Sequence, residues 1–158
     1  MAPLVPANAA VGDVGSGAGL PGIVIALLRT DVTIDLIEPL LRRTTFLDET
    51  VEALGLSQTQ VVRARAEELA GQRSYDVVTA RAVAPLPKLL SVALPLLRPG
   101  GELLALKGAT AEEELAAAQE AVVRSGAEQA EVITVHAGAQ PTWVIRVVAG
   151  EQSRTGRR

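Results

Sequence analysis

The sequence predicts an α/β protein with a mostly parallel sheet. Three observations predict this class. Short apolar strand patterns alternate with helical patterns along the chain, glycine and proline mark the boundaries between them, and a glycine-rich loop joins the first strand pattern to the first helical one. The chain has 158 residues, of which 48% are hydrophobic, enough for one domain with one core. We therefore expect one sheet with helices on both faces.

The first half of the chain predicts three strands and two helices. In order they are a strand at 9–14, a helix at 21–29, a strand at 32–38, a helix at 39–54 and a strand at 60–65. Pro21 suits a first helical turn, because its missing N–H would have no partner there. Pro39 opens the second helix, and Gly55 is the residue type that commonly ends one.

The second half predicts two helices and four more strands. In order they are a strand at 75–80, a helix at 86–97, a strand at 102–107, a helix at 111–125 and strands at 131–136 and 143–148. The sequence Pro99-Gly100-Gly101 is a turn before the fifth strand. The last two strands are too close in sequence for a crossover helix, so we expect them to form an antiparallel hairpin. Such sheets bind ligands beyond the carboxyl ends of their strands, beside the first strand.

Composition excludes several classes of function. The chain has no cysteine and a single histidine, so we expect no disulfide scaffold and no metal site. Aromatic residues make up 2% of the chain, too few for the base-stacking platforms of common RNA-binding modules. The net charge is −3, so any contact with RNA must come from a local basic patch, the arginine-rich tail or a segment outside this chain. No leader or membrane-spanning run is visible, and we expect a soluble, cytoplasmic protein with no membrane partner.

The glycine loop is the most informative motif. It reads Asp13-Val-Gly-Ser-Gly-Ala-Gly-Leu-Pro-Gly22, a D-x-G-x-G-x-G pattern. A dinucleotide fingerprint would need its third glycine at the position of Leu20, and no Gly-Lys-Ser/Thr follows as in a phosphate-binding P-loop. The pattern is the form seen in S-adenosylmethionine-dependent methyltransferases. It predicts a site for that cofactor at Asp13, Gly15 and Gly17, where the helix N-terminus suits the carboxylate of the methionine moiety.

Four charged residues follow the predicted strands at the same edge. Glu38 lies 23 positions after Gly15, where a carboxylate can accept hydrogen bonds from ribose hydroxyls. Glu67 follows the third strand, near the expected adenine edge, although Glu67 and Glu68 could simply start a short helix. Arg81 follows the fourth predicted strand, and Lys107 ends the fifth. Each is a candidate for contacting cofactor or substrate, and each could equally be a surface charge.

These motifs resemble those of the ribosomal RNA small-subunit methyltransferase G family, also called glucose-inhibited division protein B. The segments that carry the resemblance are residues 13–22, 36–43, 63–68, 79–82, 96–101 and 106–108. The resemblance implies a class I, Rossmann-like, S-adenosylmethionine-dependent methyltransferase domain with a seven-stranded sheet over residues 1–150, followed by a disordered polar tail at 151–158. It implies a cofactor site at Gly15, Leu20, Ala66, Glu67 and Arg81.

The resemblance also implies the reaction, which is methylation of N7 of a guanine in 16S ribosomal RNA. The partner would be this RNA or the small ribosomal subunit, with Arg81 and Lys107 oriented toward the O6 edge or nearby phosphates. Guanine N7 has a lone pair and no proton, so the reaction needs no general base. The family has a helical segment with a His-Leu-Leu-Asp/Asn type motif before the glycine loop, whereas this chain begins about a dozen residues before it, so we expect an N-terminally short form.

Three alternatives stay open from the sequence. The chain could be a methyltransferase for a small molecule, since the acidic net charge permits that. It could be an inactive remnant that binds a ligand without turnover. An NAD-dependent oxidoreductase is a more distant alternative, because Leu20 interrupts the dinucleotide fingerprint.

Overall fold

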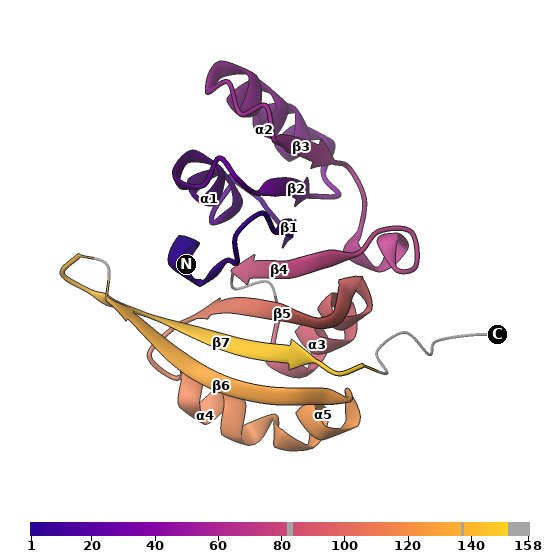
Figure 1. Cartoon of the computed structure of the whole chain (residues 1–158), viewed down its shortest axis with the longest axis vertical. Coiled ribbons are helices and arrows are strands. Elements are labelled where there is room, and N and C mark those ends of the chain that lie inside the picture. The colour runs from indigo at the N-terminus through magenta and orange to yellow at the C-terminus, as the bar shows by residue number, and fades with distance from the viewer. Residues whose placement is uncertain (82–83, 137, 152–158) are drawn as a thin grey trace.

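The computed structural model describes residues 1–81, 84–136 and 138–151, which form a seven-stranded sheet in the order β3-β2-β1-β4-β5-β7-β6 (Figure 1). Strands β1 to β5 are parallel, and β7 runs antiparallel to both β5 and β6. The α/β class and the antiparallel C-terminal hairpin are thereby confirmed. The strands are β1 Ala10–Val14, β2 Thr33–Ile37, β3 Thr59–Val62, β4 Tyr75–Arg81, β5 Leu97–Lys107, β6 Ala127–His136 and β7 Pro141–Ala149.

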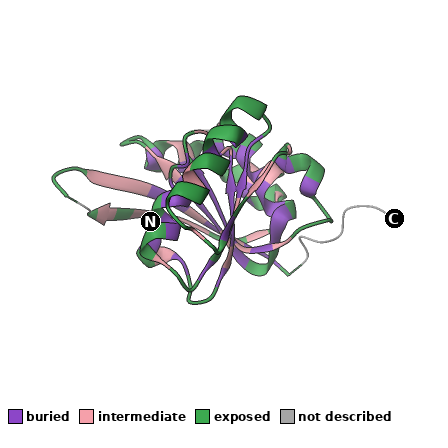
Figure 2. Cartoon of the chain, turned by 90° about the horizontal axis from the view of Figure 1, so that it is seen from above, coloured by how far each residue is buried: buried purple, intermediate pink, exposed green. Residues whose placement is uncertain are grey.

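Helices cover both faces of the sheet, as expected. The outer surfaces of these helices are exposed, while the strands between them are largely buried (Figure 2). The helices are α1 Gly22–Leu28, α2 Leu41–Ala53, α3 Leu86–Ala93, α4 Ala111–Ala117 and α5 Gln119–Arg124, with short 3-10 helices η1 Ala2–Leu4, η2 Ala66–Leu69 and η3 Leu94–Leu96.

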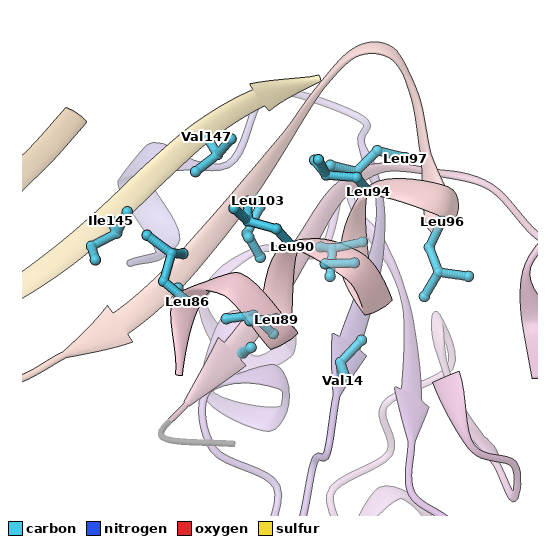
Figure 3. Packing of buried hydrophobic residues seen from close by; sticks show 14 of the residues in the cluster. Val14, Leu86, Leu89, Leu90, Leu94, Leu96, Leu97, Leu103, Ile145 and Val147 are labelled. Atoms are coloured by element: carbon cyan, nitrogen blue, oxygen red, sulfur yellow. The ribbon is translucent and has the colours of Figure 1, made fainter. Parts of the chain in front are cut away.

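The alternation of side chains along each strand divides the core into two clusters. On β4, Val77 belongs to the cluster under η1, α1 and α2, whereas Val78 belongs to the cluster under α3, α4 and α5. On β5, Leu104 and Leu103 divide in the same way. Figure 3 shows the second cluster, in which leucines of α3 and η3 face Leu103 and the valine and isoleucine side chains of β7. Both faces of the sheet are therefore buried, which explains its near-continuously apolar central strands.

Several predicted boundaries are wrong in the second half of the chain. The helix expected at 86–97 ends at Ala93, because Pro95 lies in the following 3-10 turn, and β5 then begins at Leu97. The helix expected at 111–125 is broken at Ala118, which ends α4 and begins α5. Strand β6 begins at Ala127, four positions before the expected residue 131, since its first residues are polar and exposed. Residues 152–158, most of the expected tail, lie outside the described residues.

Strand register brings the loops of the site together. Val14 of β1 pairs with Ile37 of β2 on one side and with Ala80 of β4 on the other. The residue after each of these is a predicted site residue, namely Gly15, Glu38 and Arg81. These three positions therefore lie side by side at the carboxyl edge, where the strand order reverses beside β1.

Candidate functional site

The glycine loop is fixed to the end of β2. Gly15 and Gly17 have φ of 66° and 56°, in the left-handed region that favours glycine. The N–H of Gly15 donates to the Ile37 carbonyl at 2.9 Å, and the N–H of Gly17 donates to the Glu38 carboxylate at 3.1 Å. The loop therefore has a defined shape before any ligand binds.

Gly22 is required by packing of the protein against itself. A Cβ atom there would lie 2.4 Å from the side chain of Leu36 and 2.6 Å from the carboxylate of Asp13. Contact with Leu36 and Asp13 is therefore sufficient to explain a glycine at this position. The spacing of the motif combines two separate requirements, a turn at Gly15 and Gly17 and a close helix-to-strand contact at Gly22.

Asp13 lies beneath the loop and is 1% exposed. Its carboxylate accepts hydrogen bonds from the Thr79 hydroxyl at 2.7 Å and from the Gly22 N–H at 3.2 Å. Burial raises the pKa of Asp13 to about 6, although these hydrogen bonds and the nearby Arg81 charge act in the opposite direction. Asp13 thus joins β1, β4 and the start of α1. Its direct contact with a cofactor stays a prediction.

Glu38 is also buried, at 2% exposure. One carboxylate oxygen accepts the Gly17 N–H, and the other accepts the Leu40 N–H at 3.1 Å, just before α2 begins. The guanidinium of Arg43 lies 3.7 Å from the carboxylate, with its own side chain mostly exposed. A carboxylate has about four acceptor positions, so hydrogen bonds from ribose hydroxyls remain chemically available once Arg43 moves aside. That ribose contact stays a prediction.

Two hollows meet at Gly15. The first, which we call the apolar groove, has a volume of about 220 Å³ and contains two predicted residues besides Gly15, namely Ala66 and Glu67. Its wall comes from the ends of β1 and β2, from η2 and from α3. The complete lining is Val14, Gly15, Ile37, Pro39, Ala64, Arg65, Ala66, Glu67, Ala84, Lys88, Leu89 and Val92.

The second hollow, which we call the arginine cavity, has a volume of about 790 Å³. It contains three predicted residues besides Gly15, namely Gly17, Leu20 and Arg81. Among the residues that the structure describes, three guanidinium groups and one aromatic ring line it, and no carboxylate does. The complete lining is Gly15, Ser16, Gly17, Ala18, Leu20, Arg42, Arg43, Phe46 and Arg81.

Lys107 lies in neither of these hollows. Its side chain is 8% exposed, and its ammonium donates to the Glu114 carboxylate at 2.8 Å and to the Ala84 carbonyl at 3.1 Å. The same Glu114 oxygen accepts the N–H of Leu86, at the start of α3. Lys107 therefore joins β5 to α3 and α4 in this structure, and its role in substrate binding stays a prediction.

Sequence reasoning missed three residues of the arginine cavity, Arg42, Arg43 and Phe46. All three lie in the first turns of α2 and are exposed. Glu38 ends the preceding strand at the ligand edge, so the first exposed positions of the following helix had to lie near the site. That was the available signal, although it depends on knowing which face of α2 is buried.

The described residues contain neither a membrane-spanning helix nor a cluster of metal-ligating side chains. Among residues 1–81, 84–136 and 138–151, no helix is both long and apolar enough to cross a membrane. Within the same ranges, no group of three or more His, Cys, Asp or Glu side chains is placed to hold a metal ion.

The fold is similar to those of solved methyltransferases. A methyltransferase from Pyrococcus furiosus matches with a TM-score of 0.73 at 17% identity, over 94% of this chain and 78% of that one. A putative rRNA methylase from Clostridium thermocellum matches with a TM-score of 0.66 at 17% identity, over 95% of this chain and 92% of that one. At such identities the similarity supports the fold, which is the Rossmann-like fold predicted from the motifs.

Curated relatives are much closer in sequence. The ribosomal RNA small subunit methyltransferase G of Streptomyces coelicolor is 62% identical over 127 residues, which cover 80% of this chain and 53% of that protein. Its counterpart in Thermobifida fusca is 60% identical over 121 residues, which cover 77% of this chain and 51% of that protein. The chain thus spans about half the length of these relatives. The model of the GidB family, described as rRNA small subunit methyltransferase G, matches residues 1–143, and the chain belongs to this family.

Proposed function

We propose that this chain binds S-adenosylmethionine and transfers its methyl group to N7 of a guanine in 16S ribosomal RNA. One observation carries the proposal: the rigid turn at Gly15 forms part of both an apolar groove and an arginine-lined cavity. A cofactor and an anionic substrate can therefore approach each other across the same turn. Family membership supports this assignment of the two hollows.

The apolar groove fits the adenosine of the cofactor. Ile37 and Ala66 lie in its wall, and the half-exposed carboxylate of Glu67 lies at its edge, 3.6 Å from the ammonium of Lys88. An apolar wall with a few polar groups at the rim is the common form of a nucleoside site. When bound, S-adenosylmethionine supplies an electrophilic methyl group on a sulfonium sulfur.

The residues of the arginine cavity suit the nucleophile. Guanine N7 attacks with a lone pair and carries no proton, so the reaction does not require a general base from the protein. The lining of the cavity agrees with this requirement, because its described residues include no carboxylate or imidazole. In this proposal the chain supplies orientation of the guanine, and Arg81, which lines the cavity, contacts O6, a phosphate or the cofactor carboxylate.

The test is methyl transfer from tritiated cofactor to unmethylated small subunits and to naked 16S ribosomal RNA. N7-methylguanine is then located by reduction and aniline cleavage of the RNA. The full-length Streptomyces coelicolor relative is the positive control. Label on a guanine N7 with this chain supports the proposal and tells which form of the RNA is the partner. Label only on small metabolites, or transfer by the relative and none by this chain, contradicts it.

A further inference from the structure

The arginine cavity contains two side chains that the fold itself does not use. Phe46 is 49% exposed and Arg42 is exposed, one helical turn before it on α2. The opposite face of the same helix buries Thr44 and Leu47. The core therefore accounts for that face of α2 and leaves Arg42 and Phe46 without a structural role.

Two of the three guanidinium groups of the cavity have no ion-pair partner among the described residues. Arg43 has a partner in Glu38, whereas Arg42 and Arg81 have no ion pair within the described ranges 1–81, 84–136 and 138–151. This concentration of positive charge occurs in a chain whose net charge is −3. A local basic patch on an acidic protein attracts an anion to that patch, while the negative charge of the remaining surface repels it.

The nature of the two side chains identifies the class of ligand. A guanidinium forms bidentate hydrogen bonds with phosphate, and a half-exposed aromatic ring offers a face on which a base can stack. Their spacing of four residues on one helix places both on the same side of the cavity. A small anion would use the guanidinium groups and leave Phe46 in water, while a single-stranded nucleic acid uses both.

We propose that Arg42 and Phe46 bind the RNA substrate, Arg42 through a phosphate and Phe46 by stacking against an unpaired base. The inference rests on the proposed function and deepens it, since it names the residues of α2 that hold the RNA beside the cofactor. The unpaired base is the target guanine or its neighbour. Arg42 contributes a salt-sensitive contact and Phe46 a contact that salt affects little.

The experiment measures binding of a fluorescently labelled, guanine-containing single-stranded RNA to the full chain by anisotropy, over a series of KCl concentrations. Arg42→Ala is expected to weaken binding and to reduce the slope of log K against log salt by about 0.7, the value for one phosphate contact on a single strand. Phe46→Ala is expected to weaken RNA binding by about 5- to 100-fold without changing that slope. Phe46→Tyr keeps an aromatic ring and is expected to retain most of the affinity for RNA.

Two exposed residues of α5 provide matched controls, Val123→Ala for Phe46 and Arg124→Ala for Arg42. Both controls are expected to bind RNA like the unaltered chain. The inference is overturned if Arg42→Ala and Phe46→Ala also bind like the unaltered chain, or if the unaltered chain does not bind the RNA. Calorimetry with S-adenosylmethionine on the same proteins separates the two proposals. Absence of cofactor binding by the unaltered chain contradicts the proposed function, whereas normal cofactor binding with unaffected RNA binding contradicts only this inference.

Discussion

The apolar groove and the arginine cavity share Gly15 and differ in how the fold builds them. The groove lies between the ends of β1 and β2 and the elements η2 and α3, so the register of the sheet fixes its walls. The cavity depends on side chains of α2 that project from the exposed face of a helix. The sheet therefore determines the shape of the proposed cofactor pocket, whereas the proposed substrate side depends on helix residues that can change without altering the core.

Blocking the groove is the change with the largest expected effect. Ala64 lines the groove and is half-buried, so Ala64→Trp places an indole where the adenosine is proposed to bind. We expect affinity for S-adenosylmethionine to fall by about 1,000-fold or more, equal to about 4 kcal/mol. Isothermal titration calorimetry measures this, with Ala117→Trp on the exposed side of α4 as the control. Unchanged affinity would place the cofactor outside the groove.

The buried carboxylate of Asp13 is tested through the pH dependence of stability. The folded pKa of Asp13 is about 6, above its ordinary 3.8, so between these values the folded chain retains a proton that the unfolded chain has released. The free energy of unfolding therefore falls by about 3 kcal/mol as pH rises through this window, at 1.36 kcal/mol per pKa unit. Above the window it no longer changes with the titration of Asp13. Asp13→Asn is expected to remove that fall.

Urea unfolding at several pH values from 4 to 7 checks this expectation. The other carboxylates titrate equally in both proteins, so the difference between the two profiles isolates Asp13. Parallel profiles for Asp13→Asn and the unaltered chain would show that burial of this carboxylate does not shift its pKa.

On the cavity side, Arg81 is exposed and free of ion pairs among the described residues, so its removal should affect chemistry more than folding. Arg81→Ala is expected to lower kcat/KM for methyl transfer by about 10- to 100-fold, the range for one charge-assisted hydrogen bond. The midpoint of thermal unfolding should stay the same. Equal methylation rates for the two proteins would exclude Arg81 from the site.

Lys107 is expected to affect stability more than chemistry, the opposite of Arg81, and its effect is expected to be smaller. Lys107→Ala removes the partner of the partly exposed Glu114, so we expect a loss of about 1–2 kcal/mol in unfolding free energy. Cofactor affinity should change by less than about 2-fold, because Lys107 lines neither hollow. Denaturant unfolding and calorimetry on the same sample measure both quantities. A stable variant with lost methyl transfer would instead support the substrate-binding role predicted from the sequence.

The site residues at the strand ends were predictable because they directly follow strands. Once strands are placed, Gly15, Glu38 and Arg81 must meet at one edge, and the motif order alone indicates this. The cavity residues Arg42 and Phe46 depend on the rotational phase of α2, which has only a weak apolar stripe, with Thr44 and Leu47 as its buried residues.

Tertiary contacts explain the remaining differences. The sequence shows Asp13 beside a glycine loop, but it does not show the hydrogen bond from Thr79, which joins residues 66 positions apart and gives Asp13 a structural role in the core. The break at Ala118 falls in an alanine- and glutamate-rich run with no glycine or proline to mark it. Such a break follows from how α4 and α5 pack on the sheet, which local sequence does not record.

The central claim is that the turn at Gly15 and the apolar groove form an S-adenosylmethionine site. Calorimetric titration of the full chain with S-adenosylmethionine and, separately, with NAD⁺ tests it most directly. We expect binding of one molecule of S-adenosylmethionine per chain, loss of that binding in Ala64→Trp, and no binding of NAD⁺. Binding of NAD⁺ in place of S-adenosylmethionine, or no heat from either compound, would contradict it.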